Sequence, residues 1–146
     1  MNRNEFKVMD FFNHVKDNVV VRTFRIATIE MNGFRYFLTV LCDGLPLVSD
    51  EIIPMNEVKP ILLTDDWITV NLEYKMIDTG DSDYTKVYHV HGQFIGYSDE
   101  FYYFIYPSFK GTFREVSVPI KYVHQLQNYY PAFSGKELSI NGWCFD

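Results

Sequence analysis

Residues 19–42 decide the fold class of this chain, and they read VVVRTFRIATIEMNGFRYFLTVLC. Residues 19–31 are rich in β-branched and aromatic side chains, which favour strands. They lead into Asn32-Gly33, a pair typical of the type I′ turn that joins two antiparallel strands. Residues 34–42 are apolar on both faces, as expected of a strand that is covered on both sides. The sequence therefore predicts a β-hairpin here.

A second strand pair is predicted further along the chain. From Trp67 to Ile77 apolar residues alternate with polar ones, the pattern of a strand with one buried face. Residues 85–96 carry a similar alternation. We expect the two segments to be adjacent antiparallel strands whose partner numbers sum to about 162. The residues expected in the core of this pair are Ile68, Val70, Leu72, Tyr88, Val90 and Phe94.

Two short helices are predicted at opposite ends of the chain. Residues 4–17 place Val8, Phe11, Phe12 and Val15 on one stripe at helical spacing. Residues 119–129 begin with a proline, which suits the first turn of a helix, and Pro131 is expected to end that helix. Both helices are expected to lie against a sheet.

The remaining segments are read as loops and hairpins. Residues 43–66 hold three prolines and predict a long loop with one short strand or turn. Phe101–Tyr106 and Thr112–Val118 are expected to form a hairpin around the turn that follows Pro107. Asn141-Gly142 predicts a small hairpin near the C-terminus.

These elements indicate a mainly β (α+β) fold with about seven strands, arranged as a curved antiparallel sheet or a small barrel. The length of 146 residues suits one hydrophobic core. We therefore expect a single domain over residues 1–146. The aromatic share of 18% fits this fold class, because such side chains suit pleated, half-buried surfaces.

Residues 116–123, Val-Ser-Val-Pro-Ile-Lys-Tyr-Val, resemble the end of an SH3-type barrel, where a strand meets a single turn with a proline and then a Tyr-Val strand. The resemblance implies a small SH3-like barrel. It covers eight of the 146 residues. The other aromatic positions of an SH3 peptide groove are not recognisable, so no binding residue is inferred from it.

The charge of the chain is acidic and uneven. The net charge is −6, and residues 43–100 alone hold twelve acidic residues and three lysines, a net −9. Contact with a nucleic-acid backbone needs Lys and Arg, so we expect no direct nucleic-acid binding. The N-terminus lacks a signal-peptide core, and no apolar run is long enough to cross a membrane. Cys42 and Cys144 match no metal or disulfide spacing, which favours the cytoplasm, although a bond between them stays open.

One set of residues has metal-binding chemistry. His89 and His91 share a face of the predicted strand, and the expected register brings Glu73 beside them. Two imidazoles and a carboxylate are a known ligand set for divalent metals. A polar outer face with a His–carboxylate contact explains the same residues more simply. We therefore expect no tightly bound metal and no cofactor, and keep a metal-dependent enzyme at Glu73, His89 and His91 as an alternative.

The aromatic strand at 101–106 gives the main functional hypothesis, because it has no polar side and must be covered on both faces. We expect a non-enzymatic protein-interaction module that docks onto a basic protein partner, the type that phage or mobile-element proteins, anti-CRISPR proteins included, use to inhibit a host factor. A small-ligand-binding β-barrel is a further alternative. The acidic segments 43–66 and 78–83 would steer the partner. The expected partner-binding residues are Asp65, Asp66, Tyr102, Phe104, Tyr106, Tyr129 and Tyr130.

Overall fold

The computed structural model describes residues 6–39, 47–78, 83–90, 92–108 and 112–134. The fold is mainly β and antiparallel, as predicted. The described residues divide into two compact units, one before residue 62 and one from residue 62 onward. The single domain expected over 1–146 stays a prediction. Within the described residues, no helix is both long and apolar enough to cross a membrane.

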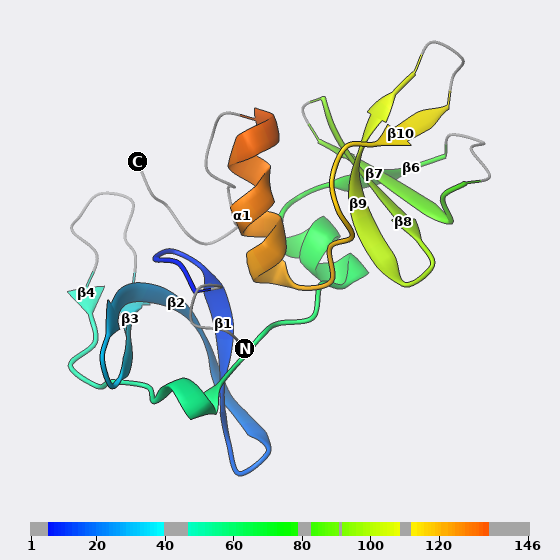
Figure 1. Cartoon of the computed structure of the whole chain (residues 1–146). Helices are drawn as coiled ribbons and strands as arrows, with labels where there is room; N and C mark the ends of the chain where they lie inside the picture. Colours follow the sequence, from blue (N-terminus) through cyan, green and yellow to red (C-terminus); the bar gives the residue numbers. More distant parts are fainter. Residues whose placement is uncertain (1–5, 40–46, 79–82, 91, 109–111, 135–146) are drawn as a thin grey trace. The chain divides into compact units, whose positions relative to one another are not determined.

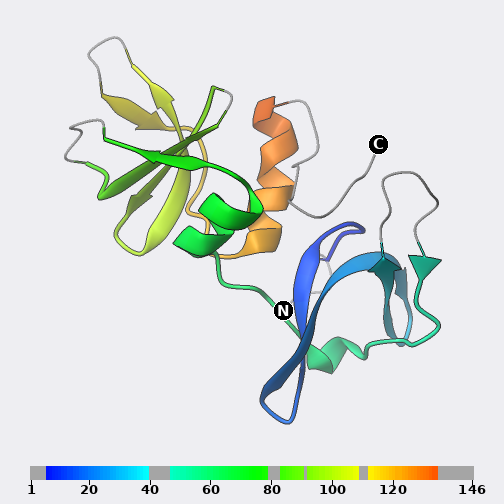
Figure 2. The same ribbon diagram turned by 180° about the vertical axis from the view of Figure 1, so that it is seen from behind.

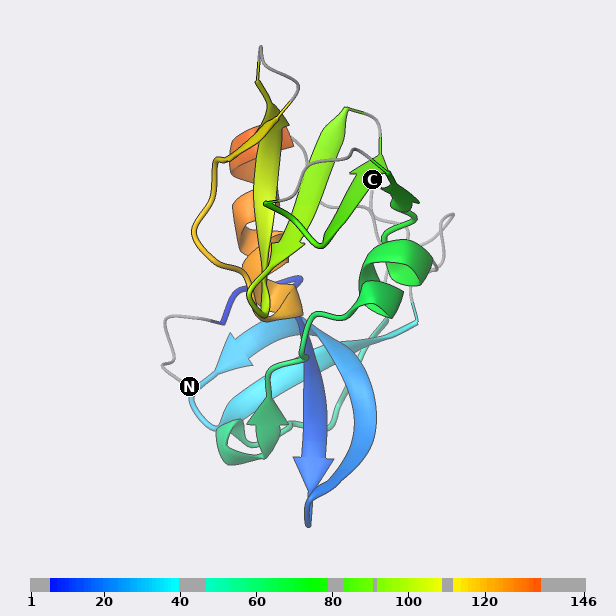
Figure 3. The same cartoon turned by 90° about the vertical axis from the view of Figure 1, so that its right-hand side faces the viewer.

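The first unit is built on a five-stranded antiparallel sheet in the order β4-β3-β2-β1-β5. The long strand β2 is strongly curved (Figure 3), because its first half pairs with β1 and its second half pairs with β3. A 3-10 turn, η2, precedes the last strand. The bounds are β1 (Phe11–Lys16), β2 (Val19–Glu30), β3 (Gly33–Thr39), β4 (Leu47–Val48), η2 (Met55–Glu57) and β5 (Val58–Lys59).

Aromatic residues fill the core of this unit. Phe12, Phe24 and Phe34 are fully buried or nearly so, and each removes a large apolar surface from water. Phe12 lies opposite Phe24 across the β1–β2 pair. The cluster of buried residues comprises Phe6, Phe12, Phe24, Ile26, Phe34, Tyr36, Ile53 and Val58.

The helix predicted over 4–17 is wrong within the described residues, because its second half forms the strand β1. Val8 is exposed while Phe11 and Phe12 are both buried, so the residues of the supposed helical stripe do not share a face. Pairing with the distant segments β2 and β5 determines the structure here, and a local pattern cannot reveal such pairing. Residues 1–5 lie outside the described part.

The hairpin predicted over 19–42 is confirmed as far as Thr39, with its turn shifted by one residue. Glu30 pairs with Gly33, so the loop is Met31-Asn32. Both residues of a type I′ turn have positive φ, and in this unit the Asp17-Asn18 loop between β1 and β2 has φ values of 54° and 62°. Predicted β residues 40–42, including Cys42, lie outside the described residues, as does Cys144.

The second unit contains another open five-stranded antiparallel sheet, in the order β10-β9-β8-β7-β6. Figure 1 shows the helix α1 and the helical segment η3 on the same side of this sheet, and Figure 2 shows the same arrangement from behind. The bounds are η3 (Trp67–Asn71), β6 (Lys75–Ile77), β7 (Lys86–Val90), β8 (Gln93–Ser98), β9 (Phe101–Pro107), β10 (Phe113–Glu115) and α1 (Val123–Ser134).

The strand predicted over Trp67–Ile77 is wrong except at its end. Trp67–Asn71 is a π-helix, and only Lys75–Ile77 forms a strand. Ile68 and Leu72 are buried as expected, but a spacing of four residues fits one side of a helix as well as one face of a strand. Val70, which should also have been buried, is 60% exposed.

The strand predicted over 85–96 is a hairpin of two strands. Val90 pairs with Gln93, and Gly92 between them has a φ of 80°. β6 does lie antiparallel to β7 as predicted, with Lys75 opposite His89 and thus a register two residues from the expected one. Tyr88 is buried, whereas Val90 and Phe94 are only partly buried.

Both faces of the aromatic strand β9 are largely covered within this unit. On one face, Tyr102 and Phe104 are buried, and the Phe104 ring lies 6.2 Å from that of Tyr130 in α1. On the other face, Ile105 belongs to a cluster with Tyr84 and Val87. The predicted pairing of β9 with the following strand is confirmed, with Pro107 opposite Phe113.

The second predicted helix exists with different ends. α1 spans Val123–Ser134, so Pro131 lies inside it rather than at its end. Ile120 precedes the helix and forms an isolated bridge to Tyr102. The segment that resembles an SH3-type barrel therefore runs into a helix and not into a Tyr-Val strand. Neither sheet closes into a barrel within the described residues. The tail hairpin predicted around Asn141-Gly142 lies outside them.

Candidate functional site

A row of three polar-tipped side chains crosses the sheet of the second unit. Lys86 of β7 lies directly opposite Tyr97 of β8, and Tyr97 lies opposite Tyr102 of β9. Residues that are opposite in neighbouring strands have side chains on the same face and in contact. The Tyr97 and Tyr102 rings are accordingly 4.8 Å apart, and the Lys86 ammonium lies 5.4 Å from the centre of the Tyr97 ring.

Asp65 reaches this row from the helical segment over 65–71. Thr64 precedes the helix, and its hydroxyl accepts a hydrogen bond from the Trp67 amide at 3.3 Å, the interaction of an N-terminal cap. The Thr69 hydroxyl donates to the Asp65 carbonyl at 2.9 Å. These local bonds fix the start of the helix and thereby the position of the Asp65 carboxylate.

The carboxylate of Asp65 accepts hydrogen bonds from three side chains. Tyr102 donates its hydroxyl to Oδ1 at 2.7 Å, Tyr88 donates to the same oxygen, and Lys86 forms an ion pair with Oδ2. Burial alone would raise the pKa of Asp65, but these three donors outweigh it and lower the pKa below its usual value. Asp65 is therefore ionised at neutral pH.

Tyr88 and Tyr102 act only as hydrogen-bond donors to Asp65. Burial, followed by the hydrogen bond to ionised Asp65, raises the pKa of Tyr88 and of Tyr102 well above the usual range. Both hydroxyls thus stay protonated at any physiological pH. Neither tyrosine can therefore serve as a general base at neutral pH.

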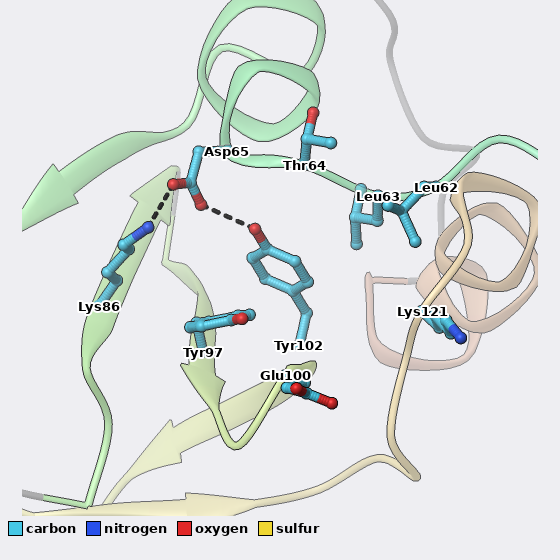
Figure 4. Close-up of a pocket in the computed structure, with 9 residues that line it drawn as sticks. All are labelled: Leu62, Leu63, Thr64, Asp65, Lys86, Tyr97, Glu100, Tyr102 and Lys121. Atoms are coloured by element: carbon cyan, nitrogen blue, oxygen red, sulfur yellow. Dashed lines mark hydrogen bonds and ion pairs between the residues drawn. The ribbon is translucent and has the colours of Figure 1, made fainter.

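A pocket of about 270 Å³ lies beside the Asp65–Lys86 pair. Figure 4 shows Asp65 and Lys86 facing each other, with the rings of Tyr97 and Tyr102 next to them. Two carboxylates and two ammonium groups line it, so its formal charge is zero. The full lining comprises Leu62, Leu63, Thr64, Asp65, Lys86, Tyr97, Glu100, Tyr102 and Lys121.

Of the residues predicted to bind a partner, the structure brings two pairs together. Asp65 is hydrogen-bonded to Tyr102, and Phe104 contacts Tyr130. Tyr102 and Phe104 are buried, so they do not contribute to an exposed face. Asp66, Tyr106 and Tyr129 are exposed. Whether these residues meet a partner stays a prediction.

The register expected for the suggested metal set, with Glu73 beside His89, differs from the observed one. His89 lies opposite Lys75, its Nε2 accepts a hydrogen bond from the Gly92 amide at 3.0 Å, and its ring stacks on Phe94 at 4.5 Å. Glu73 is exposed and lies two residues beyond the helical segment. His91 lies outside the described residues, as do 79–82 of the acidic run. Among the residues that are described, no three His, Cys, Asp or Glu side chains are grouped for a metal.

An exposed apolar surface in the first unit was missed by the sequence interpretation. Val19, Val20 and Val21 are 63%, 54% and 47% exposed. They lie at the end of the β1–β2 ribbon, which extends beyond the rest of the sheet (Figure 2). The available signal was the run of three valines itself, since a strand with one buried face should alternate with polar residues.

Comparison of the chain with protein-family models, with curated proteins and with solved structures finds no match.

Proposed function

We propose that this chain is a non-enzymatic protein-interaction module and that it docks through the end of the β1–β2 ribbon. The observation that carries the proposal is the exposure of three consecutive valines, Val19 to Val21. Three adjacent apolar side chains in water are unfavourable unless a partner covers them. Attraction of a basic partner has less support, because Asp65, one of the expected partner-binding acids, is already paired with Lys86.

The backbone of this ribbon supports the same proposal. Residues 19–25 of β2, except Val21, pair with β1 on one side, but β2 pairs with β3 only from Ile26 onward. Within the described residues, the other edge of β2 over 19–24 therefore has no strand partner. An open edge with β-branched side chains can accept an extended segment of another protein by strand addition.

Paired charge substitutions test the proposal. Val19→Lys with Val21→Lys should abolish recovery of a partner from a lysate at low salt, because a charge cannot be buried in an apolar interface without a counter-charge. The matched control is Val116→Lys with Val118→Lys, two valines of the second unit with similar exposure. Circular dichroism should show that both variants are folded.

The partner should be recovered by the wild type and the control and lost with the ribbon variant. Equal recovery by all three proteins, or no partner with any of them, would count against docking through the ribbon.

A further inference from the structure

We propose that the pocket beside Asp65 and Lys86 binds a small neutral ligand with a flat ring that carries an N–H group next to a C=O group, such as the lactam edge of a pyrimidine. This site lies in the second unit and is independent of the docking ribbon. Its size is near the lower end of the usual range for ligand pockets, about 300–1,000 Å³, which suits a single ring or a ring with a small substituent.

The hydrogen-bonding capacity of the ion pair indicates the polar part of the ligand. The Asp65 carboxylate offers about four acceptor positions, and the three donors use three of them. Lys86 has three N–H donors, and one is directed to Asp65. The Asp65 side chain is 38% exposed and the Lys86 side chain 34%. The pair thus presents a donor and an acceptor side by side, which complements an adjacent C=O and N–H.

Charge balance indicates that the ligand is neutral. Asp65 and Lys86 neutralise each other, and the other two charged residues of the lining, Glu100 and Lys121, also have opposite signs. A cation would face Lys86 at short range, and an anion would face Asp65. Either charge would lose hydration without a net gain in attraction, whereas a neutral polar group meets no such repulsion.

The walls of the pocket indicate a flat ring. Tyr97 and Tyr102 lie next to each other at 4.8 Å, and Leu62 and Leu63 complete the apolar part. Tyr102 is fixed by its bond to Asp65, while Tyr97 is only partly buried and can present its ring to a ligand. A ring that stacks on Tyr97 would place its polar edge toward Lys86, because these two residues are direct partners across β7 and β8.

Titration by ligand-observed NMR with free uracil tests the proposal, and benzoate and benzylamine test its charge preference. We expect uracil to bind about tenfold more tightly than either charged ring, because the charged rings leave a donor or acceptor of the pair unsatisfied. Propanamide carries an amide group but no ring, and it represents an amide side chain of another protein. Its binding therefore distinguishes a ring ligand from such a side chain. It should bind more weakly than uracil.

Variants of the pocket complete the test. Tyr97→Leu should weaken uracil binding about tenfold and Tyr97→Phe should leave it unchanged, since the stacking surface decides the difference. Lys86→Met should also weaken it, and the control Lys75→Met on β6 should not. Tighter binding of benzoate or benzylamine, equal binding to Tyr97→Leu and Tyr97→Phe, or no uracil binding to the wild type would overturn the proposal.

Discussion

The hydroxyl of Tyr102 donates a hydrogen bond of 2.7 Å to Asp65 although 37 positions of sequence separate the two residues. Tyr88 and Lys86 bind the same carboxylate, so one side chain joins the helical segment over 65–71 to two strands of the sheet. The stability of the second unit should therefore depend on the ionisation of Asp65.

The first prediction concerns acid. The folded-state pKa of Asp65 is lowered, so it lies below the value of about 3.9 for an unfolded aspartate. Ionised Asp65 thus stabilises the folded state above that pH, and this stabilisation is lost as the pH falls through the folded-state pKa. Asp65→Asn should lower the free energy of unfolding at pH 7, and its difference from the wild type should shrink below about pH 4.

Urea unfolding at a series of pH values measures this difference. Asp66→Asn is the matched control, because Asp66 is adjacent and exposed, and its pH profile should follow that of the wild type. A difference between Asp65→Asn and the wild type that stays constant at acid pH would contradict the prediction.

The second prediction compares two buried tyrosines. Tyr74 is 2% exposed and its hydroxyl has no hydrogen-bond partner among the described residues, whereas the Tyr88 hydroxyl is bonded to Asp65. An unsatisfied buried hydroxyl costs about 1–3 kcal/mol. Tyr74→Phe should therefore raise the free energy of unfolding by about 1 kcal/mol, while Tyr88→Phe should lower it by about 1–2 kcal/mol. Chemical denaturation of both variants measures the contrast, and a loss of stability in Tyr74→Phe would refute it.

The third prediction concerns two glycines with positive φ. A Cβ atom on Gly33 would lie 2.0 Å from the Ile53 carbonyl oxygen, whereas a Cβ on Gly92 would meet no atom within 4 Å. Gly33→Ala should cost more than about 2 kcal/mol, and Gly92→Ala only the backbone strain of about 1 kcal/mol. Thermal unfolding of each variant gives the comparison. Similar losses in both would mean that the backbone of 52–53 moves away without cost.

The fourth prediction concerns a buried histidine. His14 is 4% exposed, and its Nε2 lies 2.7 Å from the Glu57 carboxylate, which connects β1 to η2. Glu57→Ala should lower the free energy of unfolding by about 1–3 kcal/mol, because the imidazole loses its partner in a dry environment. The exposed Glu115→Ala is the control and should change little. Equal effects of the two substitutions would show that the contact contributes no stability.

Sequence patterns predicted the β2–β3 and β9–β10 hairpins but not the β1–β2 and β7–β8 hairpins. The hairpin of β2 and β3 was recognisable because two β-rich segments flank a short polar turn. Residues 67–71 were misread because the buried residues Ile68 and Leu72 satisfy both a strand and a helix. β1 was misread because its structure depends on pairing with β2 and β5, which no local pattern records.

The pocket could be predicted only in part. Asp65 and Tyr102 were both selected from the sequence, for acidity and aromatic character, but not as contacting residues. Lys86 and Tyr97 were not selected, because residues 85–96 were read as one strand. In the observed hairpin of β7 and β8, Lys86 lies opposite Tyr97. This pairing could not be derived while 85–96 was read as a single strand.

The irregular pairing of β2 has a consequence for changes in chain length. Its register shifts leave Val21 without a partner on β1 and Ala27 without a partner on β3. Deletion of either residue would remove a β-bulge, and the neighbouring side chains would stay on the same faces of the sheet. Deletion of Thr23, which pairs with Asn13, would instead turn one side of the strand over. Natural variation in the length of this strand should therefore concentrate at these two positions.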